Sequence, residues 1–98
     1  MEFNVITSGN KMVIELEGRL DTTTAPRLDT YIRESLEGID ELCMDMEKLE
    51  YISSAGLRVL LAAQKIMDGQ GRMVVTGCRE EILEIFDITG FTDVLTIE

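Results

Sequence analysis

The segment Leu49-Glu50-Tyr51-Ile52-Ser53-Ser54-Ala55-Gly56-Leu57-Arg58-Val59-Leu60-Leu61 places two serines between an apolar stretch and the expected start of a helix. Serine is favoured at a helix N-cap because its side-chain oxygen accepts a hydrogen bond from a backbone amide that would otherwise be unpaired. Those exposed amides and the helix dipole also favour an added anion such as phosphate. Ser54 therefore has two interpretations: a helix cap, which is the commoner role, or a phosphorylation site.

The helix expected over residues 55–68 is apolar around more of its surface than a core-facing stripe requires. Between Gly56 and Met67, only Arg58, Gln64 and Lys65 are clearly polar. Such a helix is either enclosed within the fold or leaves part of its apolar surface for a partner. Enclosure is hard to arrange in a chain of 98 residues, so we expect a partner surface here, with an internal role as the alternative.

Towards the N-terminus, apolar and polar residues alternate as in paired strands. We expect strands over residues 2–7 and 11–17, joined by a hairpin turn at residues 8–10, with Gly18 ending the second strand. Residues 21–24 offer several helix caps before Ala25-Pro26. The following helix is expected to reach about Glu37, to stop at Gly38, and to pack through residues at four-residue spacing, namely Leu28, Ile32 and Leu36.

The remaining apolar runs continue the alternation of strands and helices. Strands are expected at residues 42–46, between two turns, and at residues 73–76. A helix is expected at residues 79–88, with Gly90 as its cap, and a last strand at residues 94–97 closes the sheet. Strands that alternate with helices imply right-handed crossovers and parallel pairing. The prediction is a single α/β domain over residues 1–98, with a mixed, mostly parallel β-sheet, an N-terminal antiparallel hairpin and helices mainly on one side.

The charge of the chain excludes several kinds of partner. Nineteen acidic and nine basic residues give a net charge of -10, which repels nucleic acid and anionic membranes at long range. An acidic surface suits a partner with a basic docking face, but it also serves solubility alone. No apolar run approaches the roughly 20 residues of a membrane span, and no leader segment is visible, so we expect a cytoplasmic protein without membrane insertion.

The residues needed for catalysis or metal binding are largely missing from the sequence. There is no His to act as a general base for Ser54, and no glycine-rich phosphate loop or dinucleotide fingerprint is present. Cys43 and Cys78 are far apart in the chain and are expected to be free, at least half-buried thiols. Asp21 and Asp45 could hold magnesium, but solvated surface carboxylates are the simpler interpretation. We expect no catalytic residues, metal or cofactor.

Three segments in this order resemble the STAS domain family, and specifically the bacterial anti-sigma factor antagonists. They are Glu17-Gly18-Arg19-Leu20-Asp21 with Thr24-Ala25-Pro26, then Leu49 to Leu57, then Ile85-Phe86-Asp87-Ile88-Thr89-Gly90-Phe91. The resemblance covers essentially the whole chain and implies a stand-alone STAS domain at 1–98.

The resemblance implies a partner-switching mechanism. In such proteins the unphosphorylated antagonist binds an anti-sigma factor that is an ATP-dependent serine kinase, and so frees the sigma factor. Phosphorylation releases the antagonist, and a metal-dependent serine phosphatase restores it. ATP and magnesium then belong to the kinase, and the antagonist is expected to be a monomer or weak dimer. The family motif places the phosphorylated serine two positions before Gly-Leu, at Ser54. The implied docking face comprises Asp21, Thr22, Thr23, Ser53, Ala55, Gly56, Leu57, Arg58 and Leu61.

Two departures from the family pattern affect this site. Sporulation and general-stress members have Asp before the phosphoserine, where this chain has Ser53, so Ser53 is a second conceivable acceptor. They also have Gly after Gly-Leu, where this chain has Arg58. The alternative function is a constitutive STAS accessory or scaffold subunit, for example of a lipid-transport ATPase, that needs no phosphorylation. Nucleotide binding by the domain itself is a third hypothesis, supported by fold analogy alone.

Overall fold

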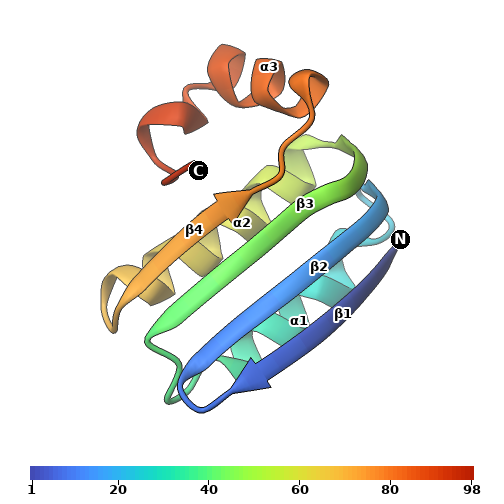
Figure 1. The fold of residues 1–98 in the computed structure, drawn as a ribbon. Coiled ribbons are helices and arrows are strands. Elements are labelled where there is room, and N and C mark those ends of the chain that lie inside the picture. The colour runs from blue at the N-terminus through green and yellow to red at the C-terminus, as the bar shows by residue number, and fades with distance from the viewer.

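The computed structural model describes all residues, 1–98, and contains one four-stranded mixed sheet (Figure 1). The strands are β1 (Glu2–Ser8), β2 (Lys11–Leu20), β3 (Glu41–Ile52) and β4 (Arg72–Thr76), and they lie in the order β1-β2-β3-β4. β1 pairs antiparallel with β2, and the β2–β3 and β3–β4 pairs are parallel. This confirms the predicted fold class.

The helices α1 (Ala25–Ser35) and α2 (Ser54–Asp68) lie side by side on one face of the sheet (Figure 1). α3 (Glu80–Thr89) follows β4 and lies past the carboxyl ends of β3 and β4. The predicted stripe on α1 is confirmed, because Leu28, Ile32 and Leu36 are all buried. α3 adds Ile82 and Phe86 to the same core. No helix is long and apolar enough to cross a membrane.

Strands β2 and β3 are longer than predicted, because β-bulges hide their periodicity. β3 runs on to Ile52, and its register with β2 shifts between the pairs Glu15↔Asp45 and Glu17↔Lys48, where Met46 and Glu47 of β3 lie opposite the single residue Leu16 of β2. Glu47 and Lys48 are consecutive and both exposed, which resembles a turn in the sequence, although the strand continues through them. Gly18 also does not end β2: it lies beside a second register shift with φ of +91°, a backbone conformation that glycine adopts readily.

The C-terminal end of the chain also differs from the prediction. In place of a strand at 94–97, the short 3₁₀ helix η1 (Phe91–Asp93) follows Gly90, and only one bridge joins Ile97 to Val75 of β4. The tight turn and the burial of Leu95 leave just the last three residues beside β4, too few for a regular strand. α1 ends at Ser35, two residues earlier than predicted, and Gly38 follows in the connection to β3.

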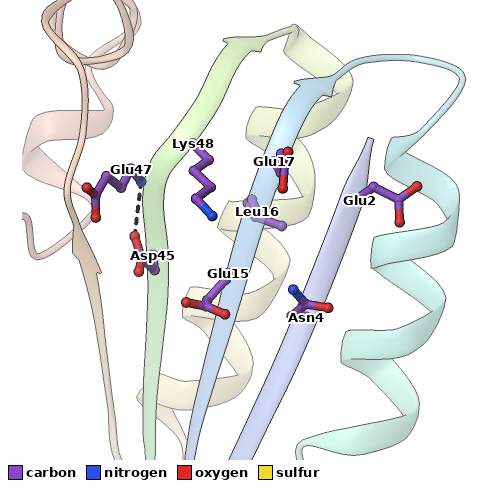
Figure 2. Close-up of a pocket in the computed structure, with 8 residues that line it drawn as sticks. All are labelled: Glu2, Asn4, Glu15, Leu16, Glu17, Asp45, Glu47 and Lys48. Atoms are coloured by element: carbon purple, nitrogen blue, oxygen red, sulfur yellow. Dashed lines mark hydrogen bonds between the residues drawn. The ribbon is translucent and has the colours of Figure 1, made fainter.

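The face of the sheet opposite α1 and α2 is acidic, and we call it the open face. Asn4, Glu15 and Asp45 occupy paired positions on β1, β2 and β3. Together with four further polar or charged residues they line a shallow depression (Figure 2), these four being Glu2, Glu17, Glu47 and Lys48. Along β2 and β3, residues of this face alternate with buried residues of the other face, as expected for a sheet with one solvated side.

Candidate functional site

The predicted site lies at the carboxyl ends of two adjacent parallel strands. The loop after β2 contains Asp21, and the junction between β3 and α2 contains Ser53 and Ser54. The backbone amide of Ser53 donates to the carbonyl oxygen of Leu20 at 2.9 Å, which ties the two segments together. In open α/β folds, ligand and partner sites form where the carboxyl ends of strands meet. The fold therefore brings the two predicted segments together.

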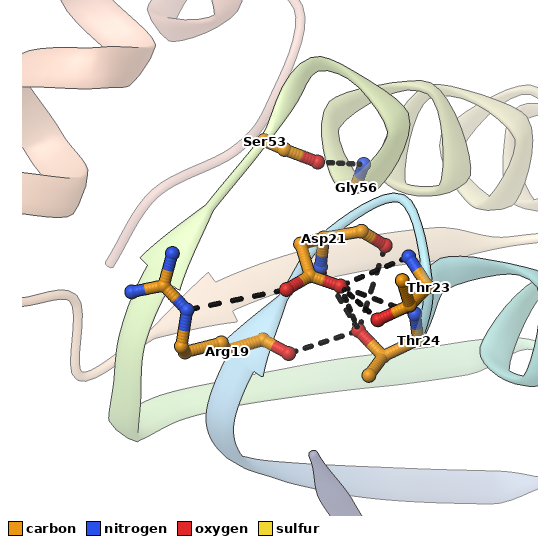
Figure 3. Close-up of polar contacts among 6 residues, drawn as sticks. All are labelled: Arg19, Asp21, Thr23, Thr24, Ser53 and Gly56. Atoms are coloured by element: carbon orange, nitrogen blue, oxygen red, sulfur yellow. Dashed lines mark hydrogen bonds and ion pairs between the residues drawn. The ribbon is translucent and has the colours of Figure 1, made fainter.

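Asp21 organises the loop before α1 (Figure 3). Its Oδ1 accepts hydrogen bonds from the hydroxyl of Thr23 at 2.7 Å and from the backbone amides of Thr23 and Thr24 at 3.0 and 3.2 Å. Because these bonds, the one from the Thr23 hydroxyl most of all, favour the carboxylate, the pKa of Asp21 lies below its ordinary value. Asp21 therefore has a structural role as a loop cap, whether or not a partner contacts it.

The helix cap of α2 is Ser53, not Ser54. The Ser53 side-chain oxygen accepts a hydrogen bond from the amide of Gly56 at 3.4 Å (Figure 3), and Ser53 has the extended backbone expected at an N-cap. Ser54 is the first residue of α2 and is exposed. The capping interpretation of Ser54 is therefore wrong. Its hydroxyl has no part in the cap and faces solvent at the N-terminal end of the helix.

Gly56 and Leu57 form the support beneath the site. A Cβ atom on Gly56 would lie 2.7 Å from Cγ1 of Ile52 and 2.8 Å from Cγ of Leu20, so only glycine allows α2 to start this close to β2 and β3. Leu57 is 6% exposed. The expectation that these two residues contact a partner does not fit their burial, and they position the segment from below.

The other predicted residues share one surface. Thr22, Thr23, Ser54 and Arg58 are exposed, and the remaining four are half-buried, namely Asp21, Ser53, Ala55 and Leu61. Thr22 from the loop and Ala55 and Arg58 from α2 line one depression between α1 and α2. Since α2 buries about half of its side chains, its apolar character serves the core and also leaves a half-buried surface beside Ser54.

Arg19 and Tyr51 also belong to this site, although they were not predicted from the sequence. The Arg19 guanidinium lies 4.2 Å from the centre of the Tyr51 ring. The Nε of Arg19 is 3.9 Å from Oδ2 of Asp21 (Figure 3). Arg19 and Tyr51 are direct cross-strand partners in the β2–β3 register. Only the β2–β3 register reveals that residues 19 and 51 are paired, because the bulges hide this pairing in the sequence.

No cluster of three or more potential metal ligands is present. Asp45 lies on the open face and Asp21 lies in the loop after β2, so the two carboxylates do not form a joint site. Cys43 and Cys78 are both free and half-buried, as predicted, and burial raises the pKa of Cys78 to about 11.

The sequence pattern of the STAS domain family matches residues 2–98. The putative anti-sigma factor antagonist BtrV of Bordetella bronchiseptica is 32% identical over 84 residues, covering 84% of this chain and 72% of the relative. The anti-sigma-B factor antagonist of Listeria monocytogenes is 31% identical, covering 87% and 76%. The fold is similar to the phosphorylated form of the Bacillus cell fate determinant SpoIIAA, with a TM-score of 0.78, 17% identity, and coverage of 99% and 91%. The two curated relatives given above are named as anti-sigma factor antagonists, and the chain belongs to the STAS domain family.

Proposed function

We propose that this protein is an anti-sigma factor antagonist, a non-enzymatic switch that binds a serine-kinase anti-sigma factor and is released when that kinase phosphorylates Ser54. A serine phosphatase would reverse the modification. The observation that carries the proposal is the exposed hydroxyl of Ser54, which the adjacent Ser53 frees by taking over the helix cap. The names of the curated relatives and the phosphorylated form of the similar Bacillus protein support the same function.

The site also suits a phosphoserine that must not unfold its own domain. The first hydrogen bond within α2 runs from the Leu57 amide to the Ser53 carbonyl oxygen, and the amides of Ser54 and Ala55 lie before it. The first turn of α2 also contains no acidic residue. A phosphate of nearly two negative charges is favoured at such a helix end. The free domain therefore tolerates the modification.

The same phosphate is expected to disrupt a docked partner. The surface beside Ser54 includes half-buried apolar side chains of Ala55 and Leu61, which a partner would cover. Covering a phosphate with a partner surface costs free energy because the group loses its water. A cost of only about 3 kcal/mol lowers affinity more than a hundredfold, since each 1.4 kcal/mol is a factor of ten.

The proposal is tested by phosphorylation in vitro. Anti-sigma factor kinases from the source genome are purified and incubated with ATP and with the wild-type, Ser53→Ala and Ser54→Ala chains, followed by intact-mass and peptide analysis. We expect a gain of about 80 Da, one phosphate, on the wild type and on Ser53→Ala but not on Ser54→Ala.

The matched pair of serine variants distinguishes the two candidate acceptors. Loss of the phosphate only in Ser53→Ala would move the acceptor to Ser53. No phosphate on any form, despite a kinase that binds the chain and is active on a known antagonist, would overturn the proposal and favour a constitutive accessory subunit.

A further inference from the structure

Ser54, Arg58, Leu61 and Lys65 follow one another at spacings of four, three and four residues along α2. Residues at these spacings lie on one side of a helix. At 1.5 Å per residue, the row extends about 16 Å from the proposed phosphoacceptor. We call Arg58, Leu61 and Lys65 the cationic stripe. It begins one helical turn beyond Ser54 and continues away from the loop that contains Asp21.

The surface along the cationic stripe combines apolar and positively charged residues. A shallow groove between α1 and α2 is lined there by six residues, none of them acidic, namely Arg33, Arg58, Leu61, Ala62, Lys65 and Ile66. Arg33 is paired with Asp29 of its own helix at 2.9 Å. Arg58 and Lys65 form no ion pair. Both charges are therefore available to a partner.

This groove has the opposite polarity to the molecule as a whole. The chain has a net charge of -10, and the open face collects Glu2, Glu15, Glu17 and Asp45 (Figure 2). The net charge alone indicates a partner with a basic docking surface. Along this groove, in contrast, complementarity requires acidic groups on the partner, together with apolar side chains to cover Leu61, Ala62 and Ile66.

We propose that the cationic stripe and its groove bind an acidic, amphipathic segment of the partner kinase, with carboxylates of that segment against Arg58 and Lys65. This inference rests on the proposed function and specifies its partner. The groove adjoins the depression next to Ser54, and Arg58 lines both, so one partner can contact the phosphoacceptor and the stripe together.

The arrangement also gives the phosphate a second effect. Arg58 lies four residues after Ser54, the spacing at which oppositely charged side chains pair on a helix. A phosphate on Ser54 therefore competes with the partner's carboxylates for the Arg58 guanidinium. Phosphorylation would then weaken the charge attraction along the stripe as well as the apolar contact.

The test measures binding of the kinase that phosphorylates Ser54, with Arg58→Glu, Lys65→Glu and, as a control, Lys48→Glu. Lys48 is exposed, forms no ion pair and lies on the open face, so the control makes the same change of charge away from the groove. We expect each groove variant to raise the dissociation constant about tenfold and Lys48→Glu to change it less than twofold. Thermal unfolding of the three variants confirms that they remain folded.

Carbodiimide cross-linking provides a second measurement, because it joins a lysine directly to a carboxylate. The chain has only three lysines, Lys11, Lys48 and Lys65. We expect peptides that link Lys65 to an Asp or Glu of the kinase. Dissociation constants within twofold of wild type for both groove variants, or cross-links through Lys11 or Lys48 only, would overturn the inference while leaving Ser54 phosphorylation intact. A kinase that neither binds nor phosphorylates the wild-type chain would remove the proposed function as well.

Discussion

Replacing Gly56 by alanine adds one methyl group at the closest approach between α2 and the sheet. The added Cβ would lie 2.7 Å from Cγ1 of Ile52, 2.8 Å from Cγ of Leu20 and 3.0 Å from the Leu20 carbonyl oxygen. Neither side chain can easily withdraw, because Ile52 is 2% exposed and Leu20 is fully buried. The N-terminal end of α2 must therefore move away from β2 and β3.

The expected change in the free energy of unfolding combines two destabilising contributions and one stabilising contribution. Overpacking a filled core costs about 1–3 kcal/mol. Moving α2 also weakens the hydrogen bond from the Ser53 amide to the Leu20 carbonyl, which contributes about 1 kcal/mol. Alanine regains about 1 kcal/mol through its higher helix propensity. The net loss in free energy of unfolding is about 2 kcal/mol, or a fall in Tm of about 8–16 °C for a domain of this size.

The assay is urea and thermal unfolding of Gly56→Ala beside Gly69→Ala. Gly69 caps the other end of α2, has a φ of -84° that alanine adopts without strain, and has its nearest neighbour, the Ile66 carbonyl oxygen, at 3.5 Å. Gly69→Ala is expected to leave stability unchanged or to raise it by up to about 1 kcal/mol. If Gly56→Ala were as stable as wild type, the close approach would not constrain this position and the argument would be refuted.

Three further predictions concern single side chains. Ser53→Ala is expected to lose about 0.5–1 kcal/mol in urea unfolding because the cap to Gly56 is lost, whereas Ser54→Ala should stay within about 0.5 kcal/mol of wild type; equal losses would contradict the capping assignment. The folded-state pKa of Asp21 lies below its ordinary value of 3.8, so the ionised carboxylate stabilises the fold above that pH, and this stabilisation is lost as the pH falls through the folded pKa. Acid titration of the free energy of unfolding should show this loss in the wild type and not in Asp21→Asn. The pKa of Cys78 is raised from 9.0 to about 11, so at pH 8 its thiolate fraction is about a hundredfold lower; in Cys43→Ser, iodoacetamide should modify native Cys78 correspondingly more slowly than the urea-unfolded chain, and equal rates would exclude the effect of burial.

The regular parts of the fold could be predicted because each follows one period. Burial alternates through most of β1 and through the first half of β2, and the stripe of Leu28, Ile32 and Leu36 determines the buried side of α1. The prediction failed where the period shifts. The bulge just before Lys48 and the one beside Gly18 each add a residue to β3, which single-sequence alternation cannot distinguish from a turn.

The assignment of the cap shows a second limit of local sequence patterns. Two consecutive serines are equally good caps by residue type, and the choice between them depends on where β3 ends. Ile52 is buried and the Ser53 amide bonds to Leu20, so the strand continues to the residue before the cap and α2 begins at Ser54. A shift of one residue decides whether the Ser54 hydroxyl is engaged in a cap or free to react.

Charge is the property for which composition and structure disagree most. The net charge of -10 suggests an acidic binding surface, yet helix geometry collects Arg58 and Lys65 in the groove along α2 while strand alternation sends Glu15, Glu17 and Asp45 to the open face. Both patterns are visible in the sequence, but only their assignment to opposite faces of the sheet gives them meaning. The Arg58 departure from the family pattern then has a specific consequence under the proposed switch: a cation one turn from Ser54 would make the affinity for an acidic partner depend directly on phosphorylation of that serine.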